Sequence, residues 1–374
     1  MKFEINVKSP LLISSSDYLN LSEVLRNGNE IYMLDINKLI YENKNMINKL
    51  KKIFMNYYNR DINESFNELQ NQYRSINNID RYKIYPAIKY NRLDIKKSDI
   101  KMPIGNYVNE DNKIFFRPFI PGSSIKGAIR NAVRNTYIKN KGASLKIYID
   151  NNFALYKFKG SNSKNLDDLL FYYNDSEKGK YDAKYDIFKF FEISDFNPED
   201  YELTIFEMSR SKQNIKGVPS YAVAISSGKF KGDILISKQL DYIYKNNKEE
   251  FYKICEKISD VFDVKFKNDL DEYKNEIIHS IMKMTYEHYK DIIKNESNYY
   301  QNVDNPMILG FGGGIEEKTI ISSLNDNTFN IVKKFIENKN SSKKNKMKFK
   351  SNRMPATVWI VNRRKLGLVS INKL

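Results

Sequence analysis

The sequence predicts an α+β protein in which strand and helix segments are interleaved irregularly. Apolar residues alternate at Phe3, Ile5 and Val7, which is the period of a β-strand. Helical periodicity dominates two other regions, at about 37–75 and from 237 onward. Apparent β-hairpins argue against a doubly wound parallel sheet. We therefore expect an α+β fold of the ferredoxin-like type, with helical insertions and a helix-rich C-terminal half.

A shift in composition near Ser237 suggests two domains, 1–236 and 237–374. The first would hold the helical insertion at about 37–75. It would also hold a hairpin, because Tyr221–Ile225 and Lys229–Ile236 flank a Ser-Ser-Gly turn. The second would be helix-rich, with a glycine-rich loop at 310–314 and two closing strands. Asp186–Ile193 predicts a further strand, which ends just before Asp195.

The charge balance favours a polyanionic partner. The 374 residues include 62 Lys and Arg against 46 Asp and Glu, which gives a formal net charge of +16. Aromatic residues make up 13% of the chain, and rings mixed with cations suit RNA, where bases stack and phosphates pair. The alternative explanation is codon bias, since an AT-rich genome also enriches Lys, Asn, Ile and Tyr.

Cysteine content and hydropathy bear on the compartment. With Cys255 as its single cysteine, the chain cannot form an internal disulfide framework or a cysteine-based zinc site. Its N-terminus has a strand pattern and does not resemble a signal peptide. No apolar run approaches the roughly 18 residues of a membrane span. We therefore expect a cytoplasmic protein with no membrane partner.

One stretch, residues 115–134, has the pattern of an anion site. After a Pro-Gly turn, Ser123 or Ser124 could cap a helix whose apolar face begins at Ile125. Lys126, Arg130 and Arg134 recur every four residues along a second face. Like charges at this spacing repel, so a facing phosphate backbone would stabilise them. Gly127 would let another backbone approach. The alternative is an ordinary amphipathic helix with a solvated basic face.

Other candidate sites lack a complete set of reactive groups. The glycines at 310 and 312–314 could cradle phosphates, although no Walker motif follows them and a tight loop explains them equally well. His279 and His288 would lie on opposite faces of one helix, so they could not act as an acid–base pair. Asp195 is best explained as a turn or a cap. We expect no cofactor and no metal site.

Four segments together resemble the RAMP superfamily, the RNA-recognition-like subunits of type III CRISPR effector complexes. Pro121–Arg130 resembles the RAMP signature, and Val7–Ile13, Phe191–Asp195 and Gly310–Gly314 followed by Lys318 agree with it in order. The resemblance implies an RRM-like RAMP fold. Within the superfamily, the length, the early helical insertion and the late glycine loop are most similar to the fifth-subunit family of the type III-A (Csm) complex.

This resemblance implies a non-catalytic subunit that binds CRISPR RNA (crRNA) and caps its 3′ end. Its partners would be the 3′ region of the crRNA, target RNA, neighbouring Csm backbone and small subunits, and host nucleases that trim the crRNA. The RNA-binding residues would be Ser123, Ser124, Lys126, Gly127, Arg130, Arg134, Gly312, Gly313, Gly314 and Lys318. Three alternatives stay open: another RAMP subunit, such as the one that binds the 5′ handle or the repeated backbone subunit; a RAMP endoribonuclease that acts on crRNA or target RNA; and a protein-interaction scaffold whose basic charge is incidental.

Overall fold

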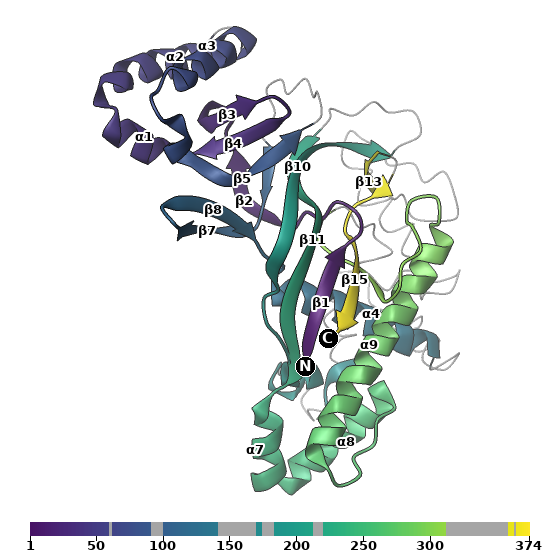
Figure 1. Cartoon of the computed structure of the whole chain (residues 1–374). Coiled ribbons are helices and arrows are strands. Elements are labelled where there is room, and N and C mark those ends of the chain that lie inside the picture. Colours follow the sequence, from purple (N-terminus) through teal and green to yellow (C-terminus); the bar gives the residue numbers. More distant parts are fainter. Residues whose placement is uncertain are drawn as a thin grey trace, which may run out of the picture.

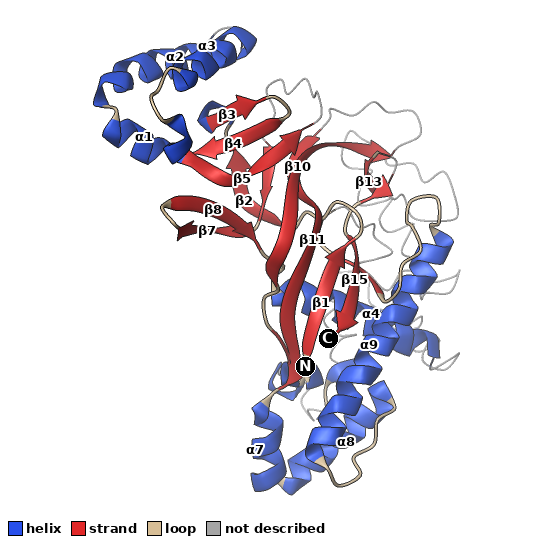
Figure 2. Cartoon of the chain, in the orientation of Figure 1, coloured by secondary structure: helices blue, strands red, loops and turns tan. Residues whose placement is uncertain are grey.

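The protein is built on one large, strongly twisted sheet with helices at its two ends (Figures 1 and 2). The computed structural model describes residues 1–59, 62–90, 100–140, 170–173, 183–211, 220–311, 358–362 and 364–374. The main path of the sheet follows the order β12 (Pro306–Ile308), β15 (Leu368–Lys373), β1 (Lys2–Val7), β11 (Ser220–Ile236), β10 (Asn197–Ser211), β5 (Lys83–Tyr90), β4 (Glu30–Leu34) and β3 (Val24–Asn27).

Shorter strands branch from this path, and helices occupy the connections. The branching strands are β2 (Ser14–Leu19), β6 (Ile100–Pro103), β7 (Gly105–Glu110), β8 (Lys113–Pro118), β9 (Phe191–Ile193), β13 (Val358–Val361) and β14 (Arg364–Lys365). The α-helices are α1 (Ile36–Glu42), α2 (Ile47–Asn59), α3 (Ile62–Arg74), α4 (Gly122–Asn140), α7 (Lys238–Asn246), α8 (Lys248–Phe262) and α9 (Leu270–Asn295). Of the helices described, none is both long enough and apolar enough to cross a membrane. The α+β class is confirmed.

The two ends of the chain pair with each other near the β12 edge of the sheet. Strand β1 pairs antiparallel with β11 on one side and with β15 on the other, so both termini lie close together (Figure 1). The main hydrophobic core takes side chains from both predicted domains, for example Ile5 and Ile225 together with Ile281 and Ile371. The predicted boundary coincides with the end of β11, and the division into two domains stays a prediction.

Helices α1, α2 and α3 form a unit at one end of the sheet, with a small core of their own (Figure 1). Leu39, Leu50 and Leu69 are among its buried residues. The Gln70 side chain joins this unit to β3, because its amide donates to the Val24 carbonyl at 2.8 Å and its oxygen accepts from the Arg26 N–H at 2.7 Å. Helices therefore occupy the region where the sequence pattern places an insertion.

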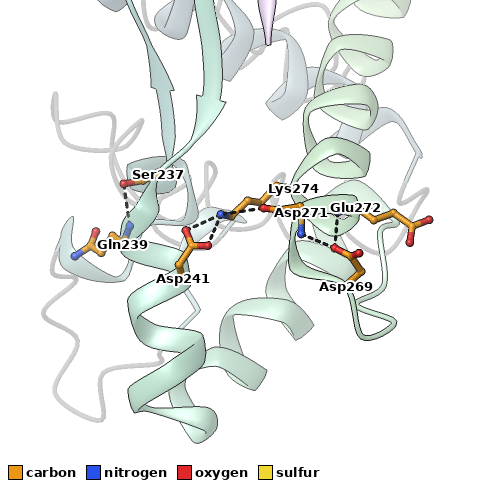
Figure 3. A network of polar contacts seen from close by, with 7 residues as sticks. All are labelled: Ser237, Gln239, Asp241, Asp269, Asp271, Glu272 and Lys274. Atoms are coloured by element: carbon orange, nitrogen blue, oxygen red, sulfur yellow. Dashed lines mark hydrogen bonds and ion pairs between the residues drawn. The ribbon is translucent and has the colours of Figure 1, made fainter.

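Helices α7, α8 and α9 begin from the opposite end (Figure 1), and polar side chains cap the starts of α7 and α9 (Figure 3). Ser237 and Asp269 cap α7 and α9 by accepting backbone N–H groups. Lys274 of α9 reaches across to α7 and contacts both carboxylate oxygens of Asp241 at 2.6 Å. The Lys274 side chain is largely buried, so this ion pair is less exposed to solvent screening than a surface pair.

Two predictions about local structure were wrong. The segment predicted as a hairpin is one continuous strand, β11, in which Gly228 adopts a φ of +153°. Register shifts against β10 occur beside it, so the Ser-Ser-Gly segment forms an irregularity within a long strand pair. The strand predicted over Asp186–Ile193 is mostly a 3-10 helix, η5 (Ile187–Phe190), followed by the short β9. Asp186 caps η5 by accepting the Phe188 N–H at 2.8 Å.

Candidate RNA-binding surface

Helix α4 begins at Gly122, and its first N–H is capped from a distant strand end. The Gly122 N–H donates to Oδ1 of Asp195 at 2.8 Å. Ser123 and Ser124 therefore lie inside the first turn, and the prediction that one of them is the N-cap was wrong. The capping residue is 73 residues away in the chain, so the local sequence could not identify it. The interpretation of Asp195 as a cap is confirmed, and its carboxylate lies at the positive end of the helix dipole.

Gly122 is the glycine of α4 that another backbone approaches. A Cβ at this position would lie 2.1 Å from the Ile193 carbonyl oxygen and 2.7 Å from that of Ser194. The sequence analysis assigned this close approach to Gly127, where a Cβ would meet nothing within 4 Å. Gly122 therefore lets the helix start against the end of β9, while Gly127 lies exposed on the helix surface.

The first turn of α4 offers a small surface to an outside ligand. Ser123 and Gly127 are exposed, and Ser124 and Lys126 are half-buried. Burial lowers the pKa of the Lys126 ammonium, nearby Asp186 raises it, and Arg130 lowers it further. Within the described parts of the chain, Lys126 has no ion-pair partner. A phosphate at this position would stabilise a charge that the fold partly desolvates.

Arg130 already has an acidic partner inside the chain. Its Nη1 contacts Oδ2 of Asp186 at 2.6 Å, and both side chains are mostly buried. The guanidinium also lies 4.6 Å from the ring centroid of Phe171 and 5.1 Å from that of Phe188. The repulsion argument for a facing polyanion therefore weakens, because Asp186 balances one of the three charges. The contact of Arg130 with RNA stays a prediction.

Arg134 lies one turn further along the helix, where α4 packs on α9. Its Nη2 donates to Oδ1 of Asn131 at 2.5 Å, and its charge lowers the pKa of His288 on α9. Burial is the main cause of that lowering, which brings the imidazole to about 4. Lys126, Arg130 and Arg134 thus do not form a uniform solvated face, because helix α9 and the segments around Phe171 and Phe188 cover part of it.

The late glycine segment is described only at its start. Gly310 has a φ of +74°, and a Cβ there would lie 2.4 Å from the Leu12 carbonyl oxygen. The Phe311 N–H donates to the same oxygen at 2.6 Å, and Lys101 lies over the Phe311 ring. Gly312, Gly313, Gly314 and Lys318 lie outside the described residues. The glycine segment follows β12 in the chain, and its first residues pack against the loop after β1. That loop also carries part of the sequence resemblance.

Sequence reasoning missed Asp186 and the aromatic residues around Arg130. The available signal was an acidic residue flanked by the Phe-rich segment 188–191, but that pattern predicted a strand. As for metals, the residues that the structure describes contain no group of three or more His, Cys, Asp or Glu side chains that could hold an ion. Cys255 is buried, as expected for a core residue, and burial raises the pKa of its thiol to about 11.

Comparison with known proteins identifies the class. A sequence model of the RAMP superfamily matches residues 4–355, so the chain belongs to this superfamily. No curated protein matches it.

Two solved structures share its fold. The first is a chain of a Csm–crRNA–target RNA ternary complex from a type III-A CRISPR–Cas system. It has a TM-score of 0.68 and 18% identity over the full length of both chains. The second is Csm5 of T. onnurineus, with a TM-score of 0.56 and 18% identity, covering 98% of this chain and 99% of that one. The RRM-like RAMP fold expected from the sequence is confirmed.

Proposed function

We propose that this chain is an RNA-binding subunit of a type III-A (Csm) CRISPR effector complex and that it caps the crRNA 3′ end. The observation that carries the proposal is the end-to-end structural match to Csm5 and to a chain of the Csm–crRNA–target RNA complex. Membership of the RAMP superfamily and the net charge of +16 support it. Neighbouring Csm subunits, crRNA and target RNA would then be the partners in antiviral defence.

The start of α4 supplies the contact with the RNA backbone in this proposal. Ser123 and Gly127 are open to a ligand, and Lys126 carries a partly desolvated charge beside them. Contacts of this kind to phosphates fix an RNA strand in register without reading its sequence. A filament-capping subunit needs contacts that do not depend on sequence, because the crRNA it binds differs in sequence from one complex to the next.

The subunit is proposed to be non-catalytic. His288 is buried with a pKa of about 4, and His279 lies on the exposed side of α9. The two imidazoles therefore cannot act together on one substrate as general base and general acid, which a paired-histidine ribonuclease mechanism requires. The Asp195 carboxylate has a structural role, because it caps the start of α4. A role in crRNA maturation would therefore be indirect, through host nucleases that the complex positions.

A crosslinking experiment tests the position of the subunit. The complex is assembled with its neighbouring subunits and with crRNAs that carry 4-thiouridine near the 5′ end or near the 3′ end. We expect this chain to crosslink to the 3′-labelled crRNA. Crosslinks confined to the 5′-labelled crRNA would make it the handle-binding subunit, and several copies per complex would make it the repeated backbone subunit. Cleavage of labelled RNA by the purified chain would contradict the non-catalytic role.

A further inference from the structure

A small pocket lies between β2 and the β7–β8 hairpin, and a residue of β6 also lines it. Its volume is about 90 Å³. Buried side chains form an apolar floor, among them Met33, Met102 and Phe116. Two tyrosine rings stand at its sides, Tyr18 with 55% of its surface exposed and Tyr107 with 61%. The ring of Tyr107 lies 5.3 Å, centroid to centroid, from that of Phe116.

Two carboxylates give the pocket an acidic rim. Asp17 and Glu23 line it, and neither forms an ion pair among the described residues. Glu23 Oε1 accepts a hydrogen bond from Nδ2 of Asn20 at 3.0 Å. Partial desolvation of the Tyr107 hydroxyl, on a side chain that is mostly exposed, raises its pKa, and the charges of Asp17 and Glu23 raise it further. Both carboxylates therefore act on the same point at the mouth of the pocket.

The sign of this rim is opposite to that of the whole chain. A net charge of +16 favours contact with nucleic acid, but two carboxylates without an ion pair among the described residues repel phosphate locally. The strands on either side each have one edge that no described strand covers. Among the described strands, β2 pairs only with β6 and β7 pairs only with β8. Charge and open strand edges thus favour a cationic group of a protein over RNA.

We propose that this acidic pocket receives an arginine side chain of a neighbouring protein subunit. The methylene stem would lie on the apolar floor, and the guanidinium would contact the rings of Tyr18 and Tyr107 together with the carboxylates of Asp17 and Glu23. Arginine combines stacking on aromatic rings with hydrogen bonding to carboxylates, and such anchors dominate interface energies. The assignment of the partner to the effector complex rests on the proposed function.

Charge-neutral variants test the pocket in the assembled complex. Asp17→Asn with Glu23→Gln removes both rim charges, while Glu68→Gln with Glu256→Gln removes two exposed charges elsewhere. We expect the pocket variant to need about tenfold more protein for half-maximal incorporation into the complex, measured by size-exclusion chromatography. The control variant should incorporate normally, and both should bind single-stranded RNA like the unmodified chain. Equal incorporation of the two variants would overturn the proposal.

A photocrosslinker identifies what fills the pocket. With p-benzoylphenylalanine in place of Tyr107, we expect adducts to an arginine-containing peptide of a neighbouring subunit, located by mass spectrometry. Adducts to RNA or to a second copy of this chain would overturn the proposal. Failure of the unmodified chain to bind RNA or to enter the complex is a separate result, which would refute the proposed function and, with it, this choice of partner.

Discussion

Two glycines of α4 differ in their surroundings, and the same substitution should affect them in opposite ways. At Gly122 a Cβ would strike the Ile193 carbonyl, so we expect Gly122→Ala to lower the free energy of unfolding by about 1–3 kcal/mol. At Gly127 a Cβ would meet nothing, and Gly127→Ala should raise that free energy by about 0.5–1 kcal/mol. Urea denaturation of both variants measures the difference, and equal shifts would contradict the packing described.

His288 should make stability depend on pH. Its folded pKa is about 4, lowered by burial and by the charges of Lys139 and Arg134 and partly restored by Asp291. An unfolded histidine titrates near 6.5. Between these values the unfolded chain binds a proton that the folded chain does not, so stability falls as the pH drops from about 6.5 to about 4. The full loss from this group is about 3 kcal/mol.

The His288 contribution can be isolated by substitution. The free energy of unfolding of His288→Leu and of the unmodified chain is measured by urea denaturation between pH 4 and pH 7. The variant should lose less stability on acidification. The exposed His279 provides the control, because His279→Gln should leave the acid loss in place. An unchanged pH profile in His288→Leu would show that the buried imidazole does not resist protonation.

At the level of elements, the sequence predicted α4 well except for its start. Periodicity identified the apolar face, and Ile125, Ile129, Ala132 and Val133 are all fully buried. The cap was missed because Asp195 is 73 residues further along the chain. The basic residues were found, but their environment was not, since Asp186 pairs with Arg130 only once η5 packs on the helix. Local pattern predicts an element, and tertiary contacts decide which side chains remain open.

In strand β11, too, local sequence could not predict the structure that tertiary contacts impose. Its Ser-Ser-Gly segment has the composition of a hairpin turn, and nothing local distinguishes a turn from a bulge. The long pairing with β10 and with β1 keeps the strand continuous. Gly228 then serves close packing, because a Cβ there would lie 2.6 Å from the Asp200 carbonyl oxygen.

A buried ion pair attaches the closing strands to α9. The Lys365 ammonium contacts Oε2 of Glu296, and only 1% of the lysine side chain is exposed. The rings of Tyr299 and Tyr300 lie within 6 Å of the ammonium. We expect Glu296→Leu to lower the free energy of unfolding by about 3–5 kcal/mol, because it removes a carboxylate that contacts a buried ammonium.

The double variant separates the pair from its parts. Lys365→Met combined with Glu296→Leu should recover most of the lost stability, because an apolar pair of similar size needs no charge compensation. Urea denaturation of the single and double variants forms a double-mutant cycle. Additive losses would show that Lys365 and Glu296 act independently.

For the whole molecule, the sequence predicted the class of fold and the superfamily better than the topology. Alternating and helical patterns indicated an α+β protein, and four short segments indicated the superfamily. The pattern could not show that β15 returns beside β1, because strand partners far apart in sequence leave no local signal. Strands from both sides of the predicted boundary at 236 therefore belong to one sheet.

The charge of the whole molecule predicts how RNA binding responds to salt. Affinity of the isolated chain for single-stranded RNA should fall linearly on a plot of log affinity against log salt concentration, because neutralised phosphates release counterions.

If Lys126 contacts a phosphate, Lys126→Ala should reduce the magnitude of that slope by about 0.7. Lys267→Ala removes the same formal charge from a lysine paired with Glu276 at 3.2 Å, and it should leave the slope almost unchanged. Filter binding between roughly 50 and 300 mM salt, about a sixfold range around physiological ionic strength, separates the two cases. Equal slopes for Lys126→Ala and the unmodified chain would remove Lys126 from the RNA-binding surface, while leaving the chain's overall attraction to RNA to other lysines.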